Sequence, residues 1–141
     1  KIKLGLQKKL FLGNLYAKRD WGDARDFVKA MWKILQQKKP SDYVIATGKQ
    51  YTVKNFVNLV LKELEMKFSW KGKNLNEKCY VNNNSIIELD KTHYRPLEVH
   101  SLLGDSSKAK RELKWKPEKN INNLIKHMVS EEMSALLNDK S

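Results

Sequence analysis

The sequence has a single cysteine, Cys79, and no long apolar run among its 141 residues. One cysteine cannot form a disulfide within the chain, which excludes a small secreted fold held together by disulfides. No segment approaches the ~18 consecutive apolar residues that a membrane-spanning helix needs. The N-terminal segment mixes lysines with apolar residues, unlike the apolar stretch of a signal peptide. These absences predict a cytoplasmic protein with no membrane partner.

Catalytic motifs are also scarce. The six glycines form neither GxGxxG nor GxxxxGK(S/T), the turns that bind phosphates, and no serine lies in a GxSxG turn. His93, His100 and His127 are not spaced as zinc ligands, either with Cys79 or with one another. A lone thiol without a neighbouring base is most simply an unreactive side chain. The residues therefore predict no catalytic group and no metal site in this chain.

The composition is that of a folded and very basic protein. Hydrophobic residues make up 40% of the chain, with four Trp, five Tyr and four Phe, which indicates one folded domain rather than disorder. Lys plus Arg number 28 against 16 Asp plus Glu, and the net charge of +12 suggests nucleic acid. The lysines, however, are spread along the chain, and Trp32 and Phe56 fall on core-facing stripes rather than on a stacking surface. A solvated basic surface with no nucleic-acid partner is favoured, and a nucleic-acid-binding module is the alternative.

Hydrophobic spacing predicts a small mixed α/β fold in which helices and short strands alternate. Helices are expected from residue 22 to Pro40, after the N-cap Thr52, from Asp105 to Pro117, and after the cap Asn120. Strands are expected at residues 10–12, 43–46, 66–70 and 85–89, with a polar loop at 71–84. The inward stripe of the first helix is expected to consist of Phe27, Ala30, Met31, Ile34 and Leu35.

Two of the four arginines stand out against a background of 24 lysines. Arg19 lies just before the first predicted helix, and Arg95 is held in an Arg-Pro turn. The planar guanidinium binds phosphate oxygens through two parallel donors, which a lysine cannot do, so both arginines are candidates for a phosphate site. The same residues could instead form structural salt bridges with Asp20 and Glu98. The residues alone leave both interpretations open.

Three stretches resemble the GDP-mannose 4,6-dehydratases of the extended short-chain dehydrogenase/reductase superfamily. They are residues 12–37 (LGNLYAKRDWGDARDFVKAMWKILQQ), 42–57 (DYVIATGKQYTVKNFV) and 94–117 (YRPLEVHSLLGDSSKAKRELKWKP). The Arg-Pro turn and the GDxxKAxxxLxWxP pattern are typical of the whole superfamily. LGNLYAKRDWGDARDFV and VIATGKQYTV are similar to the GDP-mannose dehydratase branch in particular. The resemblance covers nearly the whole chain and weakens only at 71–84.

The resemblance implies a fold and an activity. Residues 1–141 would be the C-terminal mixed α/β substrate-binding lobe of an extended Rossmann-type dehydrogenase/reductase, truncated at its N-terminus. The missing N-terminal half would bind NADP and carry the catalytic residues, so this portion would be inactive alone. The full-length enzyme, a homo-oligomer, would convert GDP-mannose to GDP-4-dehydro-6-deoxy-mannose and water on the way to GDP-fucose and other deoxysugars. A lobe of another nucleotide-sugar dehydratase or epimerase is the alternative.

The resemblance also implies six substrate-binding residues. Arg19 and Arg95 would hold the diphosphate, and Glu98 would accept hydrogen bonds from a ribose hydroxyl. The guanine pocket would be lined by Leu12, Gly13 and Asn14.

Neighbouring residues would support this site rather than touch the substrate. Trp21 and Asp26 are interpreted as scaffold residues, and Asp20 is expected to orient Arg19. Asp23 stands where the family commonly has histidine, in the first turn of the predicted helix, where the helix dipole favours a carboxylate. If Asp23 lay close to a bound phosphate, it would repel it. A lobe that normally packs against a Rossmann half is also expected to expose apolar surface when alone.

Overall fold

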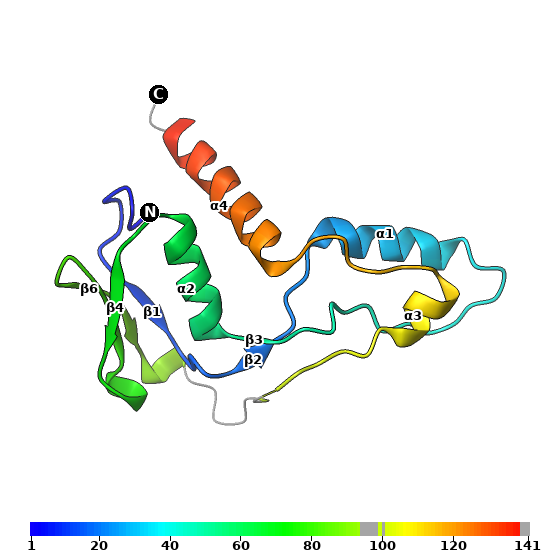
Figure 1. The fold of residues 1–141 in the computed structure, drawn as a ribbon, viewed down its shortest axis with the longest axis horizontal. Coiled ribbons are helices and arrows are strands. Elements are labelled where there is room, and N and C mark those ends of the chain that lie inside the picture. Colours follow the sequence, from blue (N-terminus) through cyan, green and yellow to red (C-terminus); the bar gives the residue numbers. More distant parts are fainter. Residues whose placement is uncertain (94–98, 100, 139–141) are drawn as a thin grey trace.

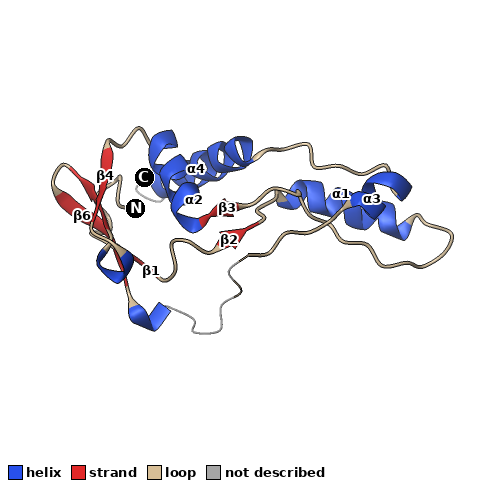
Figure 2. Ribbon diagram, turned by 60° about the horizontal axis from the view of Figure 1, so that its bottom comes forward, coloured by secondary structure: helices blue, strands red, loops and turns tan. Residues whose placement is uncertain are grey.

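The structure, a computed structural model, describes residues 1–93, 99 and 101–138. It is elongated, with a four-stranded sheet at one end and helices α1 (Ala24–Leu35) and α3 (Ser107–Glu112) at the other (Figure 1). Helices α2 (Val53–Glu63) and α4 (Ile121–Asn138) lie side by side in the middle (Figure 2). The predicted mixed α/β class is confirmed. No helix in the described part of the chain is long and apolar enough to cross a bilayer.

The sheet has the order β1-β6-β5-β4. Its strands are β1 (Leu10–Leu12), β4 (Phe68–Lys71), β5 (Lys78–Val81) and β6 (Asn84–Leu89). β1 runs parallel to β6, with Leu12 opposite Leu89, whereas the other pairs are antiparallel. Because two parallel strands end at the same edge of a sheet, the loop after β1 and the segment after β6 begin side by side.

The predicted loop at 71–84 is wrong for residues 78–81, which form β5 after a short 3-10 helix, η1 (Asn74–Asn76). β5 and β6 are joined by Asn82 and Asn83, whose φ angles of 48° and 65° are left-handed. Asparagine tolerates this conformation better than most residues, and two such residues in succession match the twist of a tight hairpin. The asparagines that suggested a loop are therefore the turn of a hairpin.

A hydrophobic core lies between the sheet and α2. Its buried members are Leu61, Cys79, Ile86 and Ile87. Cys79 is fully buried in β5, and this burial raises the pKa of its thiol to about 11. Because the thiolate is the reactive form, the burial and the raised pKa of Cys79 favour the predicted unreactive role.

A second core joins α1 to α3. It buries Ala30, Ala109, Leu113 and Trp115. Asp26, which is 2% exposed, accepts hydrogen bonds through Oδ2 from the backbone N–H groups of Glu118 (2.8 Å) and Lys119 (2.9 Å). The Asp26 carbonyl accepts another from the Trp115 indole at 2.9 Å. Asp26 thus ties α1 to the segment that leads into α4, which confirms its predicted scaffold role.

The predicted inward stripe of α1 is partly wrong. Met31 and Leu35 are 60% and 80% exposed, and Trp32, also expected in the core, is 63% exposed. The second core covers the side of α1 that carries Phe27 and Ala30. Among the described residues, nothing covers the apolar side chains on the rest of the helix. The apolar spacing of α1 therefore predicts more buried side chains than the second core covers.

The predicted strand at 43–46 is not formed. The compact β-branched run that suggested a buried strand is instead irregular in conformation, with Tyr43 and Ile45 packed on the second core and Val44 53% exposed. The backbone of Gly104 passes close by, since a Cβ on that residue would stand 2.3 Å from the Cβ of Ala46. No described strand pairs with this segment. A compact β-branched run alone does not make a strand, because the ladder of a strand needs a hydrogen-bonded neighbour.

A two-stranded sheet connects the two ends of the molecule. It pairs β2 (Lys18–Arg19) with β3 (Tyr51–Thr52) in antiparallel register. The Thr52 side chain accepts a hydrogen bond from the Asn55 N–H at 3.0 Å, which confirms Thr52 as the N-cap of α2. Asn120 caps α4 in the same way, at 3.0 Å from the Asn123 N–H.

Candidate functional site

The loop after β1 and the segment after β6 border a cavity of about 520 Å³. The loop is ordered by its own hydrogen bonds, since the Asn14 side chain accepts from the Tyr16 N–H at 2.9 Å. It is also fixed to α2, because the Leu15 carbonyl accepts from the Lys54 N–H at 2.9 Å. The residues that line the cavity are Gly13, Asn14, Leu15, Tyr16, Asn74, Leu75, Leu89 and Lys91.

An ion pair with a buried carboxylate supports one wall of this cavity. Glu77, which follows η1, is 4% exposed and accepts a hydrogen bond from the Tyr16 hydroxyl at 2.6 Å. Its other oxygen forms an ion pair with the Lys54 ammonium at 2.5 Å. The Lys54 ammonium also lies 4.9 Å from the centre of the Trp70 ring and 5.8 Å from that of Tyr16, within reach of cation–π attraction. Tyr16 is thereby joined to an ion pair whose carboxylate is almost wholly withdrawn from water, whereas the Lys54 side chain is 23% exposed.

The electrostatics of this cluster favour a charged Glu77 and a neutral Tyr16. Burial alone would raise the pKa of the Glu77 carboxyl, but the hydrogen bonds from Lys54 and Tyr16 outweigh it and hold that pKa below its usual value. The hydrogen bond to Glu77 raises the pKa of the Tyr16 phenol. At neutral pH the Tyr16 hydroxyl therefore keeps its proton and donates a hydrogen bond to the Glu77 carboxylate.

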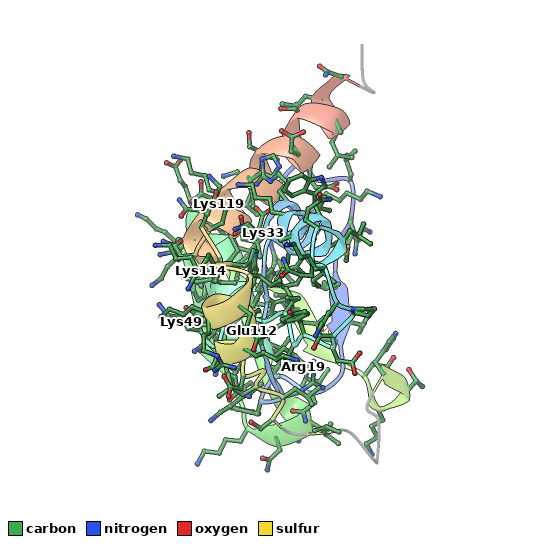
Figure 3. All side chains as sticks on the ribbon, turned by 90° about the vertical axis from the view of Figure 1, so that its right-hand side faces the viewer. Arg19, Lys33, Lys49, Glu112, Lys114 and Lys119 are labelled. Carbon is green, nitrogen blue, oxygen red and sulfur yellow. The ribbon has the colours of Figure 1, made fainter. Side chains whose placement is uncertain are left out.

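Arg19 lies on β2, opposite Tyr51, at the junction between the two ends of the molecule (Figure 3). Its Nη1 donates to the carbonyl oxygens of Lys18 (2.7 Å) and Val99 (2.8 Å). Lys18 also forms a bridge to Ser101. These contacts hold the guanidinium against the chain segment at residue 99.

The other proposed binding residues differ in where the structure places them. Gly13 and Asn14 both line the cavity. Leu12 packs on the sheet core and lines a second, apolar cavity of about 540 Å³ between the sheet and α2. Arg95 and Glu98 lie outside the described residues, so their roles stay predictions.

Asp20 and Trp21 stabilise the region around Arg19. The Asp20 carboxylate accepts hydrogen bonds from the Thr47 N–H (3.1 Å), the Thr47 hydroxyl and the Gly48 N–H (2.8 Å). Gly48 has a φ of +73°, which favours glycine in this turn. Trp21 packs on Phe56 with ring centres 4.8 Å apart, in keeping with a scaffold role. The expected action of Asp20 on Arg19 stays a prediction.

Asp23 is the N-cap of α1, one residue before the helix rather than in its first turn. It is 4% exposed and accepts hydrogen bonds from the Arg25 N–H and Nε, each at 2.9 Å. The Arg25 guanidinium lowers the pKa of Asp23 to about 2. Arg25, for which the sequence suggested no role, thus balances the charge of Asp23.

The basic surface is spread over several elements. The labelled lysines of Figure 3 come from α1, the turn before β3, and the segments that follow α3 and precede α4. Lys33 donates to the carbonyls of Leu113 and Lys114, both at 3.1 Å, and so stabilises the C-terminal end of α3. Among the described residues, no group of three His, Cys, Asp or Glu side chains could hold a metal ion.

A family model decides the relationship of this chain to known proteins. The model of GDP-mannose 4,6 dehydratase matches residues 1–128. The chain belongs to the GDP-mannose 4,6-dehydratase family. The sequence is 48% identical to GDP-mannose 4,6 dehydratase 1 of Arabidopsis thaliana over 140 residues, which cover 99% of this chain and 35% of that protein. It is 42% identical to GDP-mannose 4,6-dehydratase of Vibrio cholerae, covering 94% of this chain and 39% of that protein.

Solved structures share the fold of this dehydratase-family chain. RMD from Pseudomonas aeruginosa, complexed with NADPH, has a TM-score of 0.74 at 20% identity and covers 95% of this chain and 39% of its own. The dTDP-glucose 4,6-dehydratase of Bacillus anthracis, in complex with NAD, has a TM-score of 0.69 at 18% identity, covering 90% and 35%. The chain therefore has the fold of part of an extended dehydrogenase/reductase and spans little more than a third of these proteins.

Proposed function

We propose that this chain is the substrate-binding portion of a GDP-mannose 4,6-dehydratase and that it holds the GDP end of GDP-mannose. The observation that carries the proposal is the cavity beside Gly13 and Asn14. These residues lie in the family-matched segment and occupy the positions that the resemblance connects with guanine. Glycine lets the base approach the backbone closely, and the neighbouring amide offers hydrogen-bonding groups to its edge.

The diphosphate is assigned to Arg19, together with Arg95, and a ribose hydroxyl to Glu98. Arg19 suits this role because its backbone is held in the β2–β3 pair and one guanidinium nitrogen is oriented by the Val99 carbonyl. A preoriented guanidinium binds two phosphate oxygens with little further loss of entropy. Leu12 contributes indirectly, since it fixes the point where the loop leaves β1. Binding of this remote end orients the mannose for the reaction.

We assign the chemical step to parts of the enzyme that this chain does not span. Its residues do not fit NADP, because the six glycines form no glycine-rich turn for a pyrophosphate. The whole enzyme, in this proposal, is a cytoplasmic NADP-dependent homo-oligomer that converts GDP-mannose to GDP-4-dehydro-6-deoxy-mannose. The present chain alone is inactive and retains only nucleotide binding.

Calorimetric titration with GDP, UDP and dTDP tests the proposal. GDP should bind about tenfold more tightly than the pyrimidine nucleotides, because only guanine satisfies the polar groups of the cavity. Arg19→Ala should weaken GDP binding about 10- to 100-fold through loss of a charge-assisted contact, and should leave guanosine binding unchanged. Arg111→Ala is the matched control, since Arg111 lies on α3 and is largely exposed. Equal affinity for all three nucleotides, or equal effects of the two arginine variants, would contradict the proposal.

A further inference from the structure

Tyr16 is the aromatic side chain of the candidate base cavity. Its neighbours in sequence, Leu15 and Ala17, are each 1% exposed, whereas Tyr16 is 56% exposed. The chain therefore turns both neighbours into the protein and presents the Tyr16 ring at the surface of the cavity. An aromatic ring in this position adds a flat apolar surface to a pocket whose other large side chains include Leu75 and Leu89.

Tyr16 is held at both its backbone and its hydroxyl. The N–H donates to the Asn14 side chain, and the hydroxyl donates to the buried Glu77 carboxylate at 2.6 Å. A side chain with this exposure would otherwise sample several rotamers and lose entropy on binding a ligand. The two hydrogen bonds hold the Tyr16 backbone and the hydroxyl end of the ring in place before any ligand arrives.

Holding the Tyr16 hydroxyl through the Glu77–Lys54 ion pair has a cost in free energy. Burying the Glu77 carboxylate, whose side chain is 5% exposed, has a desolvation cost that its attraction to the partly exposed Lys54 ammonium only partly offsets, so such a pair is weak evidence for stabilisation. Lys54 is further constrained by the Trp70 ring, whose Nε1 donates to Asn58 at 2.8 Å. The arrangement is better explained by the defined orientation that it gives to Tyr16.

We propose that the Tyr16 ring is the platform on which the guanine base stacks, with Glu77 and Lys54 as positioning residues. This inference rests on the proposed function and deepens it. A nucleobase is planar and aromatic, so it matches the exposed face of a fixed phenol ring. The Asn14 and Asn74 amides and the Lys91 ammonium line the same cavity and can reach polar groups on the edge of a base.

Affinities for GDP and for inorganic pyrophosphate, which has no base, test the platform. Tyr16→Leu, which keeps bulk but removes the ring, should weaken GDP binding about tenfold and leave pyrophosphate binding unchanged. Tyr16→Phe keeps the ring and should retain most of the affinity for GDP. Equal losses for GDP and pyrophosphate in Tyr16→Leu, or no loss for GDP, would overturn the inference.

Two measurements avoid dependence on the folding of the leucine variant. In the wild-type chain, NMR should show nuclear Overhauser contacts between the Tyr16 ring protons and the guanine C8 proton of bound GDP. Contacts from the Tyr16 ring to the mannose of GDP-mannose instead, or no contacts to the base, would overturn the stacking role.

Glu77→Gln should lower the pKa of Tyr16 and weaken GDP binding while pyrophosphate binding is unchanged, which a purely structural role would not produce. If GDP binds with the predicted preference for guanine but without Tyr16, only this inference fails; if GDP does not bind, the proposed function fails with it.

Discussion

The two ends of the molecule bury their apolar side chains to different degrees. At the sheet end, Cys79 and Ile87 are 0% and 3% exposed, and the buried Glu77 has its charge balanced by Lys54. At the other end, α1 has one side in the second core, while Val28, Trp32 and Leu35 are 60% or more exposed. Both ends are built from the same kinds of residue and both contain a packed core.

The difference indicates which end of the molecule leaves apolar side chains for further polypeptide to cover. The sheet end buries the side chains of its core, although Phe11 of β1 is 47% exposed, and it holds the candidate base cavity on its own residues. The α1 end displays apolar surface of the kind that soluble proteins use for interactions, as expected for a lobe that packs against a further domain. The chain spans 35% of its Arabidopsis relative and 39% of its Vibrio relative, so most of the polypeptide of such an enzyme lies outside it. We therefore expect ligand binding to depend on the sheet end and association to depend on α1.

Truncating the core of the sheet end should have the largest effect, and truncating an exposed apolar side chain of α1 should have almost none. Ile87→Ala removes a buried side chain and should lower the free energy of unfolding by about 2–5 kcal/mol. Met31→Ala, at a 60% exposed position on α1, should change it by less than about 0.5 kcal/mol. Urea unfolding followed by circular dichroism measures both. Similar losses in the two variants would mean that α1 is covered in solution.

Breaking the link between α1 and α4 should have the next largest effect. Asp26→Ala leaves the N–H groups of Glu118 and Lys119 without their acceptor and should lower the free energy of unfolding by about 1–3 kcal/mol. Asp26→Asn keeps one acceptor oxygen of the same size and should be milder. Hydrogen exchange at residues 118 and 119 should quicken in the alanine variant. Unchanged exchange there would show that the loop is held by other contacts.

The smallest effect is expected from pH at the start of α1. The Arg25 guanidinium lowers the pKa of Asp23 to about 2, below the value of about 3.9 in an unfolded chain. The stabilisation is therefore present above about pH 4 and is lost as the pH falls toward 2, by about 1 kcal/mol because Arg25 is partly exposed. Asp23→Asn should flatten this part of the pH profile of unfolding. A profile identical to that of the wild type would exclude Asp23 as the cause.

The sequence predicted correctly those features that depend only on residues close together in the chain. The caps Thr52 and Asn120 and the strand β1 all follow from nearby residues. The strand expected at 43–46 failed because a strand also needs a partner, which no residue spacing can supply. The loop expected at 71–84 failed because Asn82 and Asn83 were counted as polar residues rather than as a left-handed hairpin turn.

The candidate site was predictable only in part. The resemblance pointed to Gly13 and Asn14, which line the cavity. It did not point to Asn74, Leu75 or Lys91, because these reach the cavity through the pairing of β1 with the distant β6. The contact between Tyr16 and Glu77 spans 61 positions in the sequence and has no local pattern. Arg25 could have been noticed, since an arginine two residues after an N-cap aspartate can pair with it.

The most direct test of the account is where GDP-mannose binds on the chain. Amide NMR spectra of the isotope-labelled chain should be recorded while GDP-mannose is added. The account predicts that the shifts concentrate at the sheet end and its junction, at Gly13, Asn14, Tyr16 and Arg19, while α1 and α3 stay unchanged. Shifts confined to α1 and α3, or none at saturating ligand, would contradict the claim that this lobe holds the GDP end.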